Sequence, residues 1–182
     1  MNPLDELNRL TSLFSPPEEL IAGVEHVPGA LVPEPYKTLL VHEHHMTVTM
    51  EEFHGSRVNV TVLADSLDGD VYTRKIVLSR VSDGVPVQFG LVRFNFQYVT
   101  QVVRDELLAK QIPLGHVLIR HNVLRHIDLG AVLKIRAGAE LAELLQMPAN
   151  EITYGRLATI FCNGLPAVDL LEISAPVVER TE

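Results

Sequence analysis

Two tight turns, each set between segments of alternating hydrophobicity, constrain this fold more than any other feature of the sequence. Ser-Asp-Gly at residues 82–84 separates alternating segments at 71–81 and 85–96. Asn-Gly at residues 163–164, the strongest short hairpin signal in the chain, separates a second pair of alternating segments. Short connections of this kind force the two flanking strands to run antiparallel. The sequence therefore predicts an antiparallel sheet built from hairpins.

Helical patterns fall at the start of the chain and between the hairpins. They occupy residues 4–14, 36–54, 100–110 and 138–145. Because these helices do not alternate with the strands one by one, the pattern argues against a parallel sheet. We predict an α+β fold, with an antiparallel sheet of about six strands and flanking helices that cover one face. The six strands are predicted within residues 58–62, 71–81, 85–96, 122–135, 152–162 and 165–174.

The length of 182 residues corresponds to a single domain with its own core. Residues 15–35 contain five prolines and few periodic positions, which predicts an extended segment that lies over the surface. We therefore divide the chain into an N-terminal helix with this extended wrap, residues 1–35, and the main domain, residues 36–182. The two parts are expected to form one structural unit.

Composition argues against several classes of partner. The chain carries 15 basic and 23 acidic side chains, a net charge of −8, and no run rich in lysine and arginine. Nucleic acid and anionic membranes are therefore not expected as partners, and no apolar run is long enough to span a bilayer.

The single cysteine, Cys162, excludes a disulfide framework, and no export signal is visible, so we expect a cytoplasmic protein. The sequence does not predict the oligomeric state.

Strand alternation places three charged side chains on otherwise apolar faces. They are Arg74, Arg156 and Glu172, each of which shares its face with aliphatic or aromatic neighbours. A buried charge costs several kcal/mol unless it is paired. Two interpretations are open from the residues alone. One is a structural arginine–glutamate pair or a strand end that reaches solvent; the other is a pocket for a small anion, with the glutamate kept near-neutral as a proton donor or acceptor.

A histidine cluster, His42, His44 and His45 around Glu43, has the residue types of a metal site. No second set of ligands with matching spacing accompanies it, and the HExxH arrangement is absent. Capping or packing is therefore the favoured role, and no metal is predicted. Glycine-rich phosphate loops are also missing, so no nucleotide cofactor is predicted.

Short segments between residues 36 and 176 share their order and spacing with a known family. They are His45-Met46-Thr47 with Glu51 and Gly55, Tyr72 to Leu78 with Asp83-Gly84-Val85-Pro86, Ile112-Pro113-Leu114-Gly115, Tyr154-Gly155-Arg156, and Gly164-Leu165-Pro166 with Leu171-Glu172. Together they resemble the chorismate pyruvate-lyases and the wider superfamily with their fold, which includes effector-binding domains of bacterial transcription regulators. The resemblance implies a six-stranded antiparallel sheet flanked by helices.

The resemblance also implies a buried site for 4-hydroxybenzoate beneath helical flaps. Arg74 is expected to pair with the ring carboxylate, assisted by the backbone N–H of Leu114. Glu172 is expected to meet the oxygen at the opposite end of the ring, near the backbone of Met46. The implied reaction is the elimination of pyruvate from chorismate without a cofactor, with Glu172 and Arg74 as the catalytic pair. The chain is thus expected to be a carbon–oxygen lyase whose partner is a small aromatic carboxylate.

Two departures from the family pattern concern this site. Leu91 stands where some lyases carry an arginine, so the second carboxylate of chorismate is expected to be bound by Arg93, on the same face as Leu91, or by Arg156. The spacing from Pro166 to Glu172 is one residue longer than in some members. A bulge is expected there, because a shift of register by one residue would turn the glutamate to the other face.

Two other functions fit the same residues. The first is a binding protein for an aromatic carboxylate, on the same fold and without catalysis. The second is an oligomerisation domain in which the buried arginine–glutamate pair is structural.

Overall fold

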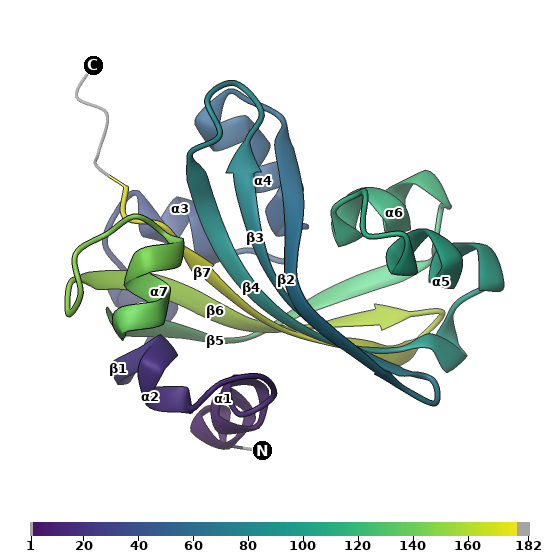
Figure 1. Ribbon diagram of the computed structural model, residues 1–182, viewed down its shortest axis with the longest axis horizontal. Helices are drawn as coiled ribbons and strands as arrows, with labels where there is room; N and C mark the ends of the chain where they lie inside the picture. Colours follow the sequence, from purple (N-terminus) through teal and green to yellow (C-terminus); the bar gives the residue numbers. More distant parts are fainter. Residues whose placement is uncertain (1, 178–182) are drawn as a thin grey trace.

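All seven strands that the structure describes pair antiparallel in one sheet. The structure is a computed structural model, and it describes residues 2–177, so residues 178–182 of the main domain lie outside this account. The strands are β1 (Ile21–Val27), β2 (Val58–Asp68), β3 (Val71–Arg80), β4 (Pro86–Asn95), β5 (Arg125–Ala137), β6 (Ile152–Cys162) and β7 (Leu165–Ser174) (Figure 1). Their order across the sheet is β1-β5-β6-β7-β4-β3-β2. The predicted α+β fold with an antiparallel sheet is confirmed.

The hairpin between β6 and β7 forms where the sequence predicts it. Asn163 and Gly164 have φ angles of 54° and 81°, the left-handed pair that a two-residue hairpin turn requires. The predicted bulge is also present. Ile160 pairs with Val168 and the next residue of β6 pairs with Pro166, so Ala167 is left over in the ladder. This extra residue keeps Glu172 on the face that alternation assigns to it.

The sheet has one strand more than predicted, because the proline-rich segment at 15–35 contains β1. This strand pairs with β5 at the edge of the sheet. None of its residues is fully buried, so the sequence lacks the clean alternation of apolar and polar residues that marks a strand. The strand β1 itself thus contributes mainly backbone hydrogen bonds, whereas Leu20 and Val32 on either side of it are buried in the hydrophobic clusters.

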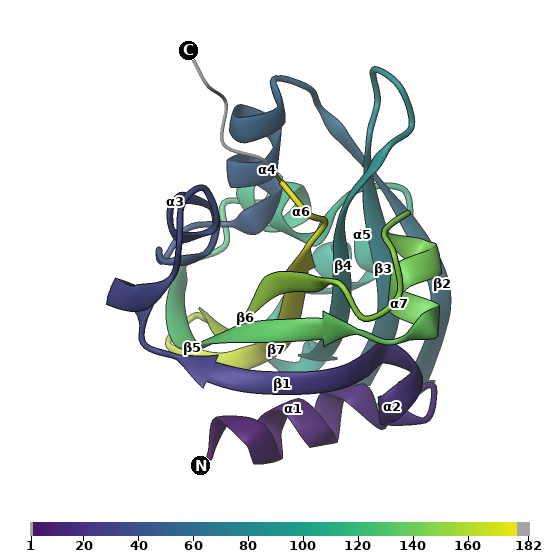
Figure 2. The ribbon, with the colours of Figure 1, turned by 90° about the vertical axis from the view of Figure 1, so that its left-hand side faces the viewer.

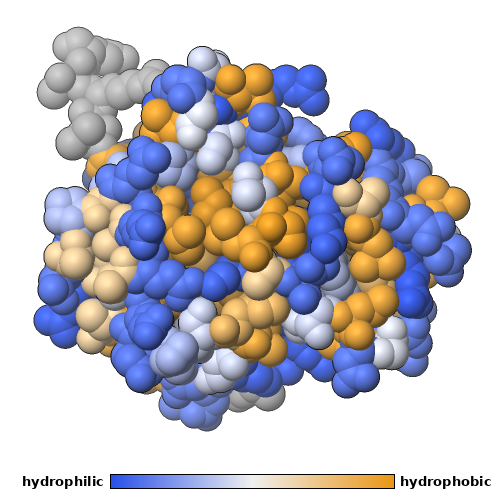
Figure 3. Space-filling model, viewed as in Figure 1, coloured by the Kyte–Doolittle hydropathy of each residue, from blue (hydrophilic) through white to orange (hydrophobic). Residues whose placement is uncertain are grey.

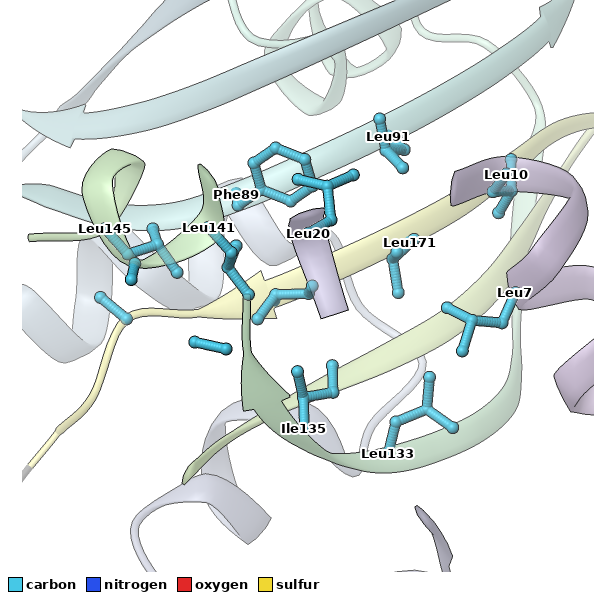
Figure 4. Close-up of a cluster of buried hydrophobic side chains, with 14 of the residues drawn as sticks. Leu7, Leu10, Leu20, Phe89, Leu91, Leu133, Ile135, Leu141, Leu145 and Leu171 are labelled. Atoms are coloured by element: carbon cyan, nitrogen blue, oxygen red, sulfur yellow. The ribbon is translucent and has the colours of Figure 1, made fainter. Parts of the chain in front are cut away.

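Helices cover both faces of the sheet, whereas one covered face was predicted. They are α1 (Pro3–Thr11), α2 (Pro17–Leu20), α3 (Tyr36–Leu40), α4 (Met46–His54), α5 (Gln101–Leu108), α6 (Leu114–Arg120) and α7 (Ala139–Leu144), with 3-10 turns η1 (Gly29–Leu31) and η2 (Phe96–Tyr98). On one face, Leu7, Leu10 and Leu141 of α1 and α7 form a cluster with strand residues such as Leu91 and Leu171 (Figure 4). In Figure 2, α1 and α2 lie at the bottom and α3 and α4 at the top.

The opposite face carries two separate hydrophobic clusters. Residues of α3 and α4, among them Met46, pack with Ile76 and Leu78. Residues of α5 and α6, among them Leu114, pack with Val92 and neighbouring strand residues. The seam between these two clusters is the place where polar side chains can be buried without disrupting either core.

One face of the molecule exposes hydrophobic residues at its surface. On the face shown in Figure 3, hydrophobic residues gather at the centre and hydrophilic residues surround them. Within residues 2–177, no helix is long and apolar enough to cross a membrane.

Candidate functional site

A small cavity lies at the seam, enclosed by the sheet, the start of α4 and the start of α6. Its volume is about 30 Å³. Of the six residues predicted to form the site, five line this cavity, namely Arg74, Glu172, Arg156, Met46 and Leu114. Segments far apart in the sequence are thus brought together as expected.

The strands set the spacing of the charged groups. Arg74 lies on β3, and Glu172 lies on β7, with β4 between them. Gly90 of β4 pairs with Glu172 and also lines the cavity. Neighbouring strands lie ~4.8 Å apart, so the backbones of Arg74 and Glu172 are separated by roughly 10 Å across the sheet. Because Gly90 has no side chain, Ile76 of β3 packs directly over it, and a Cβ added at Gly90 would lie 3.0 Å from Ile76 Cγ1.

Arg156 and Glu172 form the structural arginine–glutamate pair that the first of the two interpretations predicted. The two residues are direct cross-strand neighbours, and Arg156 Nε donates to Glu172 Oε2 at 2.8 Å. The other two nitrogens donate to backbone carbonyls, Nη1 to His42 O at 2.8 Å and Nη2 to His44 O at 2.9 Å. Arg156 is 1% exposed, and each of its nitrogens is bonded. It therefore holds both Glu172 and the segment before α4 against the sheet.

Arg74 is equally buried, at 1% exposure, but has no such partners. Within residues 2–177, none of its three guanidinium nitrogens has a hydrogen-bond partner. The nearby Tyr72 hydroxyl donates to Asp65 Oδ2 at 3.2 Å, and Asp65 also pairs with Lys110 at 2.7 Å. Burial lowers the pKa of Arg74, and this effect is opposed by the nearby Tyr72 hydroxyl, through its charge and its hydrogen-bonding interaction, and by the charge of Asp65. A buried and unpaired guanidinium is costly, so this group is available to an anion from outside the chain.

The histidines before α4 support the walls of the cavity. His42 Nε2 donates to Leu39 O at 2.7 Å, so its Nδ1 is the acceptor for the backbone N–H of His44 at 3.1 Å. His45 Nε2 accepts a hydrogen bond from Arg125 Nε at 2.7 Å. Burial, followed by the charge of Arg156, lowers the pKa of His42 to about 4, and burial with Arg125 does the same for His45. Both rings are therefore neutral at physiological pH.

A metal does not fit these histidines. No group of three or more histidine, cysteine or carboxylate side chains in the described part of the chain could hold a metal ion. The ring nitrogens of His42 and Nε2 of His45 are already used in hydrogen bonds within the protein.

The expectation for Arg93 needs a correction, because this side chain lies on the opposite face of the sheet. Val92 pairs with Arg74 and shares its face, so the next residue points the other way. Arg93 Nη1 lies 3.7 Å from Asp169 Oδ2, which also accepts from Arg9 of α1 at 2.8 Å. Arg93 thus helps to hold α1 and cannot reach a ligand in the cavity. Leu91 belongs to that same far face.

Sequence reasoning missed two polar contributors to the site. Gln88 is buried at the cavity, and its Oε1 has no hydrogen-bond partner within residues 2–177. Alternation from Gly90 and Val92 could have found it, because all three share a face. Arg125 reaches His45 across 80 residues of sequence, and no local pattern reports such a contact.

Comparisons with known proteins give a fold and no family. No family model matches the sequence, and no curated protein matches it. A structure described as the ligand-binding domain of a GntR-family transcriptional regulator from Bordetella bronchiseptica is 15% identical with a TM-score of 0.51, over 64% of this chain and 85% of that chain. PhnF from Mycobacterium smegmatis is 14% identical with a TM-score of 0.52, over 78% of this chain and 71% of that chain.

The effector domain of PhnF, taken alone, gives the same TM-score of 0.52 at 14% identity, over 72% of this chain and 88% of that chain. At such identities the likeness shows a shared fold. The chain therefore has the fold of these ligand-binding and effector domains, which is the fold that the sequence resemblance implied.

Proposed function

We propose that this chain is a binding domain for a small aromatic carboxylate. The observation that carries the proposal is Arg74, a fully buried guanidinium whose three nitrogens have no partner within residues 2–177. Arginine binds a carboxylate with two parallel hydrogen bonds, and such charge-assisted bonds are among the strongest in proteins. An anionic ligand would satisfy donors that the protein itself leaves unsatisfied.

The rest of the cavity supports an aromatic body. Ile76, Val92 and Leu170 line it together with the charged residues. At the far end Glu172 is held by Arg156, so its carboxylate is positioned to accept a hydrogen bond from a ring hydroxyl. A ring with a carboxylate at one end and a hydroxyl at the other, such as 4-hydroxybenzoate, matches this order of groups. The similar solved structures are described as ligand-binding and effector domains, which favours binding over catalysis.

The cavity must widen to admit such a molecule, because about 30 Å³ holds little more than a water molecule. The cover consists of the starts of α4 and α6, and a hydrogen bond of 3.0 Å between His116 Nε2 of α6 and Glu51 Oε2, farther along α4, joins the two helices. Gly115 of α6 approaches so closely that an added Cβ would lie 3.1 Å from Thr47 Oγ1. We infer that the ligand enters when these two short helices separate. We propose that the protein binds this ligand in the cytoplasm.

Calorimetric titration with benzoate, 4-hydroxybenzoate and the neutral isostere benzamide tests this function. We expect both carboxylates to bind and benzamide to bind at least tenfold more weakly, because a charge-assisted fork contributes about 1.5–3 kcal/mol. Arg74→Ala should weaken 4-hydroxybenzoate binding about ten- to a hundredfold, and Arg74→Lys should restore part of it. Equal affinity for benzoate and benzamide, or an Arg74→Ala variant that binds normally, would contradict the proposal.

Chorismate pyruvate-lyase activity is the second candidate function. It is favoured by one observation, the presence of a buried carboxylate, Glu172, in the same cavity as Arg74. Protein incubated with chorismate should then release pyruvate and 4-hydroxybenzoate in equal amounts, with activity that survives a strong chelator. Glu172→Gln should bind 4-hydroxybenzoate but turn over at least about a hundredfold more slowly. Binding of 4-hydroxybenzoate without release of pyruvate from chorismate would leave the binding domain as the function.

A further inference from the structure

The buried guanidinium of Arg74 has a carboxylate beside it that it does not bind. Asp65 on β2 is the direct cross-strand partner of Arg74 on β3, so the two side chains leave the same face of the sheet. The Cβ atoms of such partners lie ~5 Å apart, a separation across which opposite charges interact. Within residues 2–177, however, no guanidinium nitrogen of Arg74 has a hydrogen-bond partner. Other groups must therefore hold the carboxylate of Asp65 away from Arg74.

Two such groups bind the carboxylate of Asp65. Its Oδ2 atom lies 2.7 Å from Lys110 Nζ and accepts a hydrogen bond from the Tyr72 hydroxyl at 3.2 Å. The Tyr72 ring is buried and stacks on Phe96, with 5.4 Å between the ring centroids, so the core fixes the position of the hydroxyl. Of the two groups, only Lys110 carries a charge. Lys110 is thus the cation that competes with Arg74 for Asp65.

Lys110 stands at a backbone position that favours glycine. It lies two residues after Leu108, the last residue of α5, and its φ angle is 60°. Helices often end with a residue in this left-handed conformation, and glycine is preferred there because a Cβ is unfavourable. A lysine at such a position indicates that its side chain makes a contribution that glycine could not make. In this structure that side chain makes the ion pair with Asp65.

We propose that Lys110 is a positioning residue for the binding site, which holds Asp65 away from Arg74 and so keeps the guanidinium unpaired for a ligand carboxylate. Lys110 does not line the cavity in the part of the chain that the structure describes, so it acts through Asp65. Without the ammonium group, Asp65 would keep only the neutral hydroxyl of Tyr72 and would pair with Arg74. A ligand would then have to displace it. This inference rests on the proposed binding function and adds a residue that controls the affinity of the same site.

A second ion pair on the same helix provides a matched control. Arg104 Nη1 of α5 lies 2.9 Å from Asp70 Oδ1, and Asp70 belongs to the turn between β2 and β3. Removing Arg104 takes away one positive charge and one contact between α5 and this hairpin. It releases no carboxylate beside Arg74, because the cross-strand partner of Arg74 is Asp65. A difference between Lys110 and Arg104 variants therefore reports on Asp65 and not on net charge.

The first test measures the dissociation constant of 4-hydroxybenzoate by calorimetry. Lys110→Met should weaken binding about tenfold or more, because the ligand must break a charge-assisted pair. Lys110→Gly, which suits the φ angle of 60°, should weaken it to the same extent, and Lys110→Arg should bind normally. Asp65→Asn added to Lys110→Met should restore the affinity to within about threefold of the wild type, since an amide forms no ion pair. Arg104→Met should stay within about twofold of the wild type.

The second test needs no ligand and measures the urea midpoint of unfolding. In the wild-type background, Arg74→Met removes an unpaired buried charge, so the midpoint should stay the same or rise. In the Lys110→Met background, the same change should lower the midpoint by about 1 M or more, because it breaks a buried ion pair with Asp65. An ion pair that only ties α5 to β2 would not make the effect of Arg74→Met depend on Lys110.

The outcomes separate this inference from the function on which it rests. Suppose that 4-hydroxybenzoate binds through Arg74. If Lys110→Met then weakens it no more than Arg104→Met does, if Asp65→Asn restores nothing, or if Arg74→Met shifts the midpoint equally in both backgrounds, the role of Lys110 is wrong and the binding function stands. If no benzoate binds the wild type, or Arg74→Ala weakens none, both the function and the role of Lys110 are overturned.

Discussion

The cavity has an arginine at each end. Both arginines are buried, but their hydrogen-bond partners differ. Arg156 and Arg74 are both 1% exposed. Arg156 bonds to Glu172 and to two backbone carbonyls, whereas the guanidinium nitrogens of Arg74 have no partner within residues 2–177. Desolvation costs the two groups about the same, so the difference in partners is a difference in role. One guanidinium stabilises the fold, and the other keeps its donors available for a ligand.

Other polar side chains around the cavity also divide into those with hydrogen-bond partners and those without. Near Arg156, the rings of His42 and His45 have defined donors or acceptors. Elsewhere in the cavity lining, the buried Oε1 of Gln88 lacks a partner in the described part of the chain, as the guanidinium nitrogens of Arg74 do. A native interior leaves few such atoms unsatisfied, and two side chains of this kind around one cavity indicate a binding site.

The largest expected effect is on stability, in Arg156→Met. The variant leaves Glu172 as an unpaired buried charge and removes the donors of two carbonyls, so the free energy of unfolding should fall by about 3–5 kcal/mol. Urea denaturation followed by circular dichroism measures this loss. Arg156→Met combined with Glu172→Leu should recover part of it, because no buried charge is left unpaired. A loss below about 1 kcal/mol would remove the proposed difference between the two arginines.

A smaller effect is expected from pH, and it belongs to the Arg156 end of the cavity. The pKa values of His42 and His45 are about 4 in the folded protein and near 6.5 when unfolded. Between these values the unfolded chain binds more protons, so stability is complete above pH ~6.5 and is lost as the pH falls toward 4. We expect a loss on the order of 1–2 kcal/mol, after allowing for the solvent that reaches both rings.

Urea denaturation at pH 7 and pH 5 checks this effect, with His42→Gln and His45→Gln as comparisons. Each variant should lose less stability over that interval than the wild type does. If the variants and the wild type lose the same amount, the titration of other groups accounts for the pH dependence.

The smallest effect is expected for Gln88→Met in the cavity lining. The change removes a buried carbonyl oxygen that has no partner and keeps the volume of the side chain, so the stability of the free protein should be unchanged or should rise by up to about 1 kcal/mol. The same denaturation experiment measures it. Destabilisation by more than about 1 kcal/mol would show that Gln88 is already satisfied in the folded protein.

Local sequence patterns predict most strands of the sheet and the sheet face that lines the cavity. The turn at Asn163-Gly164 was predicted because turn geometry is a local property, whereas the extra residue near Pro166 was expected from the spacing in the family that the sequence resembles. The strand β1 was not predicted, because none of its residues is fully buried and the surrounding prolines resemble those of a loop. The helix α6 was also missed, since Pro113 and Gly115 resemble a turn although they lie at its start.

The charged residues show where the sequence stops being informative. Alternation placed Arg74, Arg156 and Glu172 correctly on the cavity face, and the same rule assigned Arg93 to the far face once the pairing of β3 with β4 was known. Which arginine is paired could not be predicted, because the partners of Arg156 include carbonyls of His42 and His44 more than 100 residues away. Such contacts depend on how the segment before α4 crosses the sheet.

The central claim is that Arg74 is kept unpaired for an anionic ligand. It is tested most directly by measuring the free energy of unfolding of the wild type and of Arg74→Met, each with and without 4-hydroxybenzoate. Without ligand, the variant should be as stable as the wild type or more stable, because an unpaired buried charge is removed. Ligand at about a hundred times its dissociation constant should stabilise the wild type by ~2.7 kcal/mol and the variant much less. A free variant that is as unstable as Arg156→Met, or one that the ligand stabilises as much as the wild type, would contradict the claim.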